Sequence, residues 1–240
     1  MLFVPLSGMQ TREKRFWTGA ALVSGEMVAT MLLFTGAVVS FFFLTRERWR
    51  RYKKWDLNAF ERVQRLVSPS NNRRMLFITA LGKHQFLVPA NLSVLGWYLF
   101  VRKHTWFSVR VVSIALSSLG LMLLFKKIFS RKRPANPLLS PVRGMSFPSG
   151  HAMMSTTFYG LLIYIITQKS GPAAQAALIP PLVLLILAVG FSRIYLRVHY
   201  TSDVLAGHTI GLAWLGLSLN TIRRLEAFNR EQVRRLTSPG

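Results

Sequence analysis

The sequence contains no cysteine and few carboxylates. With no Cys in 240 residues, thiol catalysis, disulfide bonds and cysteine-based metal sites are excluded. Asp and Glu together number only 8, whereas sites for divalent metal ions normally use several carboxylates. This shortage disfavours a metal-dependent site, although one carboxylate with two histidines would still suffice for zinc.

Positive charge and apolar residues are abundant instead. Lys and Arg number 31, the formal net charge is +23, and 51% of the residues are hydrophobic. Such an excess of basic residues can indicate a nucleic-acid partner. Here, however, the basic residues form short clusters between apolar runs, as they do where cationic side chains anchor helix ends at a lipid surface. We therefore predict a membrane protein with the lipid bilayer, and no nucleic acid, as its partner.

Six apolar runs predict the fold. They cover residues 20–44, 76–101, 109–125, 152–167, 173–191 and 204–219. A bilayer core of about 30 Å requires about 20 apolar residues per helix, so snorkelling Lys and Arg must extend the shorter runs. We expect an all-α protein with six transmembrane helices in a bundle, forming one membrane domain over residues 1–240.

A basic segment, residues 46–74, separates the first two predicted spans. Its apolar positions approximate one face of a helix, with Arg and Lys over the rest, which is typical of a helix lying in the headgroup plane. A solvated, charged loop is the alternative, because the helical period is imperfect. The apolar positions are Trp49, Tyr52, Trp55, Leu57, Phe60, Val63 and Val67.

The direction of successive helices places the polar clusters on one side of the membrane. If six helices alternate in direction, the ends of spans three and five and the starts of spans four and six all lie on the same side. The residues found there are Lys126, Arg133 and Pro134, then His151, then Arg193 and His199, and finally Asp203.

Three cations at this side predict an anion site. Lys126 and Arg133 are seven residues apart, and face the same way if the helix continues that far, with Pro134 helping to end it. Arg193 adds a planar guanidinium, which suits bidentate contact with phosphate oxygens. A helix beginning near Ser149 would direct free backbone N–H groups at the anion, and Gly150 would allow close approach.

Two histidines provide reactive groups beside these cations. His199 and Asp203 are four residues apart, so on a helix the carboxylate can accept the imidazole N–H and leave the other nitrogen free as a nucleophile. Asp203 would also stabilise the charged imidazole. His151 can then give a proton to the leaving oxygen.

Together these residues resemble the phosphatidic acid phosphatase type 2 superfamily, specifically its membrane lipid phosphatase branch, which is related to vanadium haloperoxidases. Three motifs match in order: K-x6-R-P from Lys126, P-S-G-H from Pro148, and S-R-x5-H-x3-D from Ser192. The resemblance covers about residues 76–219, the expected phosphatase core.

The resemblance implies a role for each site residue. Catalysis would depend on His199 as the nucleophile that forms a phosphohistidine, His151 as the proton donor and Asp203 as the orienting carboxylate. No metal or other cofactor would be needed. The phosphate would be bound by Lys126, Arg133, Ser149, Gly150 and Arg193.

The expected activity is removal of phosphate from a membrane lipid phosphate or diphosphate. A phosphate site at helix ends favours a substrate whose tail stays in the lipid. The bacterial relatives act on phosphatidylglycerophosphate, phosphatidic acid, undecaprenyl diphosphate or lipid A, and the motifs do not choose among them. A lipid phosphotransferase is one alternative, and a non-catalytic membrane protein that binds anionic lipids is another. The oligomeric state is not predicted.

Orientation gives conflicting signals. The predicted active-site side carries 18 Lys and Arg residues and the other side 12, with Lys83 set aside. The positive-inside rule would place the site in the cytoplasm. The family's membrane branch usually faces outward, so we expect a bacterial cytoplasmic membrane protein with its site facing the periplasm or exterior.

Several polar residues near the motifs have simpler explanations. Lys127, Arg131 and Lys132 are expected to mark a helix end at the interface. His208, between Gly207 and Gly211, is expected to serve helix packing. Lys83 and His84 lie at the start of the second run and are weaker candidates for headgroup contact, while Glu26 has no assigned role.

Overall fold

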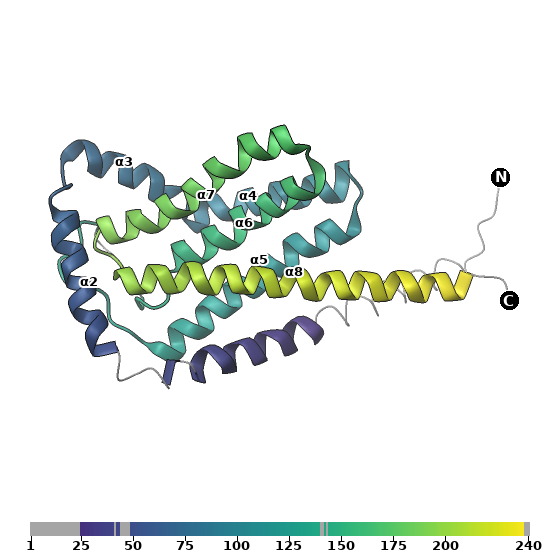
Figure 1. Cartoon of the computed structure of the whole chain (residues 1–240), viewed down its shortest axis with the longest axis horizontal. Coiled ribbons are helices and arrows are strands. Elements are labelled where there is room, and N and C mark those ends of the chain that lie inside the picture. The colour runs from purple at the N-terminus through teal and green to yellow at the C-terminus, as the bar shows by residue number, and fades with distance from the viewer. Residues whose placement is uncertain (1–24, 41, 44–48, 140–141, 143, 238–240) are drawn as a thin grey trace.

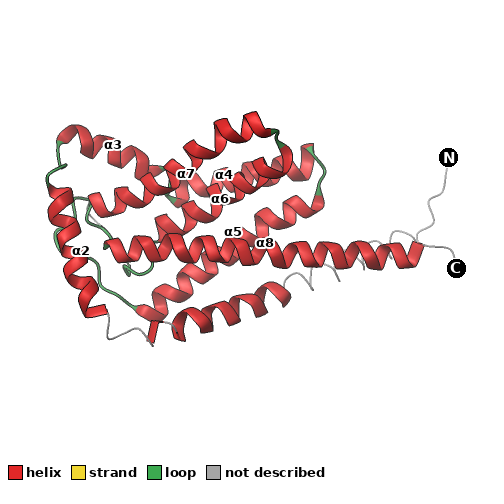
Figure 2. Ribbon diagram, viewed as in Figure 1, coloured by secondary structure: helices red, strands yellow, loops and turns green. Residues whose placement is uncertain are grey.

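The computed structural model describes residues 25–40, 42–43, 49–139, 142 and 144–237. Over these residues the chain is helical and contains no strand (Figure 2). The prediction of an all-α protein is therefore confirmed. The helices are Gly25–Ser40, α2 Trp49–Gln64, α3 Pro69–Ala80, α4 His84–Gly96, the π-helix η2 Trp97–Val101, α5 Thr105–Phe129, α6 Gly150–Lys169, α7 Pro172–Tyr195 and α8 Thr201–Thr237.

The predicted count of six membrane spans is not confirmed. Every predicted apolar run overlaps a helix, but only α5 and α7, among the described residues, are both long and apolar enough to cross a bilayer. The helix Gly25–Ser40 is apolar but shorter than a full span. Both α6 and α8 carry Gly, Ser and Thr at positions that pack against other helices, which lowers their hydropathy.

The second run, predicted as one span, is three consecutive helical segments. Ser68 begins α3, because its hydroxyl accepts a hydrogen bond from the Asn71 N–H at 3.2 Å and Pro69 occupies the first helical position. The chain then turns before Lys83, which precedes α4 in an extended conformation. This break packs against α7 and the start of α6, as Gly82 shows: a Cβ there would lie 2.4 Å from Cγ1 of Val189 and 3.2 Å from Cδ2 of His151.

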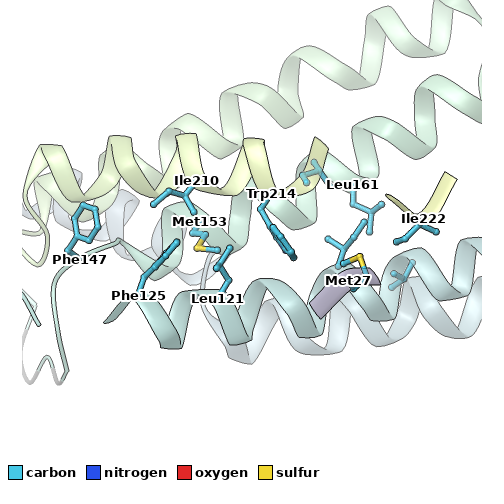
Figure 3. Close-up of a cluster of buried hydrophobic side chains, with 12 residues drawn as sticks. Met27, Leu121, Phe125, Phe147, Met153, Leu161, Ile210, Trp214 and Ile222 are labelled. Carbon is cyan, nitrogen blue, oxygen red and sulfur yellow. The ribbon is translucent and has the colours of Figure 1, made fainter. Parts of the chain in front are cut away.

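The hydrophobic core lies between α5, α6, α8 and the helix Gly25–Ser40 (Figure 3). Trp214 is fully buried at its centre, and its indole N–H donates to the Ser117 hydroxyl at 3.1 Å. Phe125 and Phe147 extend the core to the end of the bundle where the polar residues meet. This packing fixes the ends of α5 and α6 relative to α8.

Helix α2 lies across the end of the bundle, transverse to the long helix α8 (Figure 1). The prediction of a helix within the basic segment is confirmed, which removes the loop alternative. The helix ends at Gln64 instead of reaching Val67, since Ser68 and Pro69 begin α3. Its buried face carries Asp56 and Phe60, while Trp55 and Leu57 are exposed.

Candidate active site

The ends of α5 and α7 and the starts of α6 and α8 lie at the end of the bundle nearest α2 (Figure 1). The backbone N–H of Ser149, just before α6, donates to the carbonyl of Asp203 in α8 at 3.0 Å. Lys126, near the end of α5, donates to the carbonyl of Pro148 at 3.3 Å. The structure thus brings the predicted site residues to one end of the fold, as alternating helix directions require.

Arg133 is positioned at the site by the loop after α5, and not by a continuation of the helix as expected. Helix α5 ends at Phe129, because Ser130 adopts a left-handed conformation with a φ of 43°. Arg133 therefore does not share a helical face with Lys126. Instead the loop after α5 folds back, and Nη1 of Arg133 lies 2.7 Å from the carbonyl of Val198 and 3.1 Å from Nε2 of His199.

The contact between Arg133 and His199 defines the state of the imidazole. A guanidinium has only donors, so Nε2 of His199 must accept and, in the neutral ring, the proton must lie on Nδ1. This tautomer leaves the Nε2 lone pair directed at the cations. His199 is only 2% exposed, and its burial, with the charges of Arg133 and Arg193, lowers its pKa to about 4 despite the opposing effect of Asp203. A neutral imidazole with an unprotonated Nε2 is the form that a nucleophile requires.

Asp203 supports His199 less directly than the four-residue spacing predicts. Its Oδ2 lies 3.8 Å from Nδ1 of His199, too far for a hydrogen bond. The reason is that α8 begins at Thr201, so His199 precedes the helix and the helical alignment is incomplete. The Ser146 hydroxyl lies between them, 2.5 Å from Oδ2 and 3.4 Å from Nδ1. Ser146 therefore links the buried carboxylate to the imidazole.

Three predicted site residues hold buried polar atoms that have no hydrogen-bond partner in the described part of the chain: Nε2 of His151, Oγ of Ser149 and Nε of Arg193. Leaving such atoms unpaired costs free energy, so a ligand that forms hydrogen bonds with them would bind favourably. A bound phosphate ester offers acceptor oxygens to a guanidinium, a hydroxyl and an imidazole N–H. These three atoms therefore fit an oxyanion ligand.

Two of the predicted phosphate-binding cations, Lys126 and Arg193, donate hydrogen bonds to uncharged groups. Lys126 donates to the carbonyl of Met145 at 2.7 Å, and Arg193 donates to the Thr79 hydroxyl at 2.5 Å. Neither forms a salt bridge to a carboxylate in the described residues. Their charges thus remain available to an anion, and α3 contributes to the site through Thr79.

Gly150 has a packing role that the sequence did not predict. A Cβ at this position would lie 2.7 Å from Sδ of Met122 and 3.8 Å from Cε of Lys126. The missing side chain lets the start of α6 approach α5 closely. This approach holds the first backbone N–H groups of α6 beside Lys126.

Sequence reasoning missed three polar residues of this site. Ser146 lies two residues before the P-S-G-H motif and received no role, and Arg131 was interpreted as marking a helix end at the interface. In the structure Nη1 of Arg131 donates to Oδ1 of Asp203 at 2.6 Å, and its Nη2 donates to Asp56 at 2.9 Å. One signal was available, since Asp56 is one of only 8 carboxylates and lies in a strongly basic segment.

The remaining candidates lie at or outside the edge of this cluster. His208 is hydrogen-bonded to the Thr156 hydroxyl at 2.8 Å and joins α8 to α6, as its packing role predicts. His84 is exposed at the start of α4. Within the described residues, no group of three or more His, Asp or Glu side chains is placed to hold a metal ion.

Comparisons with known proteins agree on one family. Residues 107–226, half of the chain, match the model of the PAP2 superfamily. Phosphatidylglycerophosphatase B of Bacillus subtilis is 28% identical over 165 residues, which cover 68% of this chain and 81% of that protein. Decaprenylphosphoryl-5-phosphoribose phosphatase of Mycolicibacterium smegmatis is 32% identical over 110 residues, covering 44% of this chain and 54% of that protein.

Two solved structures share the fold. The crystal structure of the first transmembrane PAP2 type phosphatidylglycerolphosphate phosphatase from Bacillus subtilis aligns with a TM-score of 0.67 and 24% identity, covering 82% of this chain and 94% of that one. The crystal structure of Aquifex aeolicus LpxE aligns with a TM-score of 0.56 and 24% identity, covering 68% and 94%.

Proposed function

Because the chain belongs to the PAP2 superfamily, we propose that it removes phosphate from a membrane lipid phosphate or diphosphate, without a metal ion, through a phosphohistidine at His199. The curated relatives are phosphatases named for lipid-linked substrates, which supports the predicted class of lipid phosphate phosphatase. The observation that carries the mechanism is the contact of Arg133 with Nε2 of His199.

The first step is attack on phosphorus. The substrate phosphate would displace Arg133 from Nε2 and bind among Lys126, Arg133 and Arg193. Burial and the charge of Arg193 lower the pKa of His151 to about 2, and the negative charge of the bound phosphate ester would raise this pKa, so that His151 enters the reaction protonated. The Nε2 lone pair forms the bond to phosphorus while the bond from phosphorus to the leaving oxygen breaks, and protonated His151 gives its proton to that oxygen. Negative charge then spreads over the phosphoryl oxygens, where fixed cations stabilise the transition state.

The second step releases phosphate. Neutral His151 accepts a proton from water, the water oxygen bonds to phosphorus, and the bond to Nε2 breaks. Inorganic phosphate leaves, and His199 regains its neutral form with the proton on Nδ1. Asp203 and Ser146 lie on the Nδ1 side, where the carboxylate stabilises the positive charge that the ring carries while it is phosphorylated.

The surface of the protein supports a lipid substrate. Large apolar side chains point outward from α5 and α7, with Leu116 65% exposed and Leu184 67% exposed. Such surfaces fit an integral membrane protein, in which the acyl chains of a substrate lie beside the helices while its headgroup enters the site. Phosphatidylglycerophosphate is the first substrate to test, since a similar protein and a similar solved structure, both from Bacillus subtilis, carry its name.

Phosphate release in the presence of EDTA tests this function. Purified protein in detergent is given phosphatidylglycerophosphate, phosphatidic acid, undecaprenyl diphosphate and lipid A in parallel. We expect release from at least one of them with EDTA present, and a loss of at least about a hundredfold in His199→Gln. Dependence on an added divalent metal would overturn the mechanism.

The same assay separates the alternatives. Transfer of the phosphate to a second lipid, without release, would identify a phosphotransferase. Binding of anionic lipid with neither release nor transfer would identify a non-catalytic protein. The complete set of reactive residues favours a catalytic protein over the non-catalytic alternative.

A further inference from the structure

A buried carboxylate in α2 belongs to none of the three motifs. Asp56 is 1% exposed, although its helix is strongly basic. Its Oδ1 accepts the backbone N–H of Ser202 at 2.9 Å, and its Oδ2 accepts the Ser202 hydroxyl at 2.7 Å and Nη2 of Arg131 at 2.9 Å. A buried carboxylate is costly unless it is paired in this way, so the arrangement is specific.

Arg131 joins this carboxylate to the catalytic one. While Nη2 donates to Asp56, Nη1 donates to Oδ1 of Asp203 at 2.6 Å. The guanidinium carbon lies 4.2 Å from the centre of the Tyr200 ring, and that ring lies 5.7 Å from the ring of Phe60 in α2. One planar guanidinium, held between an aromatic ring and two carboxylates, thus connects α2 to Asp203.

The connection determines which oxygen of Asp203 faces the nucleophile. Oδ1 is occupied by Arg131, so Oδ2 is left to accept the Ser146 hydroxyl at 2.5 Å and the Tyr200 N–H at 2.9 Å, on the side of His199. Charge matters as well as orientation. Arg131 alone would cancel much of the negative charge that Asp203 presents to a charged imidazole, and Asp56 balances Arg131.

We propose that Asp56 is a positioning residue for the phosphatase reaction, acting through Arg131 to orient Asp203 and to preserve its negative charge toward His199. Helix α2, from the basic interfacial segment, is then part of the catalytic apparatus as well as a surface element. The proposal rests on the proposed function, because it assigns Asp203 and His199 their roles there.

Charge-preserving and charge-removing variants test the proposal. Asp56→Asn keeps the size of the side chain but leaves Arg131 unbalanced. We expect kcat to fall by about tenfold to a hundredfold, the loss typical when a group that orients a functional side chain is removed. KM should change little, since no phosphate-binding residue is altered. Arg131→Lys should behave similarly, because an ammonium lacks the fork that reaches both carboxylates.

Glu61→Gln is the matched control, since it removes the same charge from an exposed position of the same helix and should leave kcat unchanged. A double variant of Asp56→Asn with Arg131→Lys should lose no more than the worse single variant, as expected for residues acting as one unit. A purely structural role would lower the thermal midpoint in detergent and leave the imidazole nitrogen shifts of His199 unaltered. The proposal predicts altered imidazole nitrogen shifts of His199 and an unchanged thermal midpoint.

Two results would overturn it. One is an Asp56→Asn protein as active as Glu61→Gln; the other is an activity loss that follows the loss of folded protein. If Asp56→Asn does not fold, Arg131→Lys decides alone, since Arg131 is partly exposed. Failure of the proposed function is distinguishable, because then the wild-type protein itself would not release phosphate in EDTA.

Discussion

At the scale of single residues, the proposed reaction depends on whether the imidazole of His199 is protonated. Burial and the neighbouring charges of Arg133 and Arg193 lower its pKa to about 4, below the usual value of about 6.5. The protonated ring has no lone pair on Nε2, so only the neutral ring can attack phosphorus. In the proposed mechanism, a lowered pKa therefore keeps His199 neutral and able to attack in mildly acidic conditions, where an exposed histidine would be protonated.

This lowered pKa can be measured by NMR on protein with isotope-labelled histidine. The chain has 5 His, and the signals missing from His199→Gln identify the ring of His199. Without substrate, we expect that ring to be mostly neutral at about pH 5 and to titrate near pH 4. A midpoint close to about 6.5 would mean that the ring is solvated, and would contradict the buried geometry.

The sequence predicted the motif residues of this site but not the side chains that connect them. Lys126, Arg133, His151, His199 and Asp203 were recognised because their types and spacings indicate phosphate chemistry. Asp56 and Arg131 lie 75 positions apart, and their contact depends on the path of the loop after α5 and on where α2 lies. Neither is encoded in a local pattern, so this ion pair could only be found in the structure.

Close packing of α6 on α8 holds the two halves of the site together. Gly207 lies opposite the carbonyl of Ser149, and a Cβ there would lie 2.8 Å from that oxygen. Since Ser149 directly precedes α6, the oxygen cannot move away without moving the start of the helix that carries His151. Gly211 repeats the arrangement one turn further along, where a Cβ would lie 2.9 Å from the carbonyl of Met153.

Gly207→Ala should therefore lower both stability and activity. We expect a loss of about 1–3 kcal/mol in unfolding free energy, as for overpacked cores, and a larger fall in kcat/KM, because the start of α6 is displaced from Asp203. Thermal unfolding in detergent and phosphate release measure the two effects. Gly216→Ala is the control on the same helix, where a Cβ would meet no described atom within 4 Å. Equal behaviour of the two variants would disprove the packing role.

Helix boundaries were harder to predict than the presence of helices. Apolar runs located each helix, because burial in protein or lipid requires them. The early end of α5 depends on the left-handed backbone of Ser130, a residue with no strong preference for that conformation. At the break between α3 and α4, Gly82 packs closely against Val189 of α7 and His151 of α6, and no local sequence pattern predicts these contacts.

At the scale of the whole molecule, the open question is which side of the membrane the candidate site faces. The long helices run side by side and α2 crosses their end (Figure 1), and we propose that α2 lies in the headgroup plane, as the sequence predicts. The Lys and Arg count favours a cytoplasmic site by 18 to 12, whereas the family expectation is an outward-facing site. We propose the outward orientation.

Labelling of single cysteines tests the orientation without background, since the chain contains no Cys. Lys54→Cys introduces an exposed thiol in α2 and Arg223→Cys an exposed thiol in α8, far from the candidate site. In intact bacterial cells, a membrane-impermeant thiol reagent should modify the first and spare the second. Modification of only the second would place the site in the cytoplasm.

Trapping of phosphate on His199 tests the central mechanism most directly. Protein turning over a lipid phosphate in EDTA is quenched in alkali, which preserves phosphohistidine, and its peptides are examined by mass spectrometry. We predict a phosphate on His199 in the wild-type protein, and its absence in His199→Gln. Rapid release of phosphate from the wild-type protein with no phosphate on His199 at any time of quenching would contradict the account.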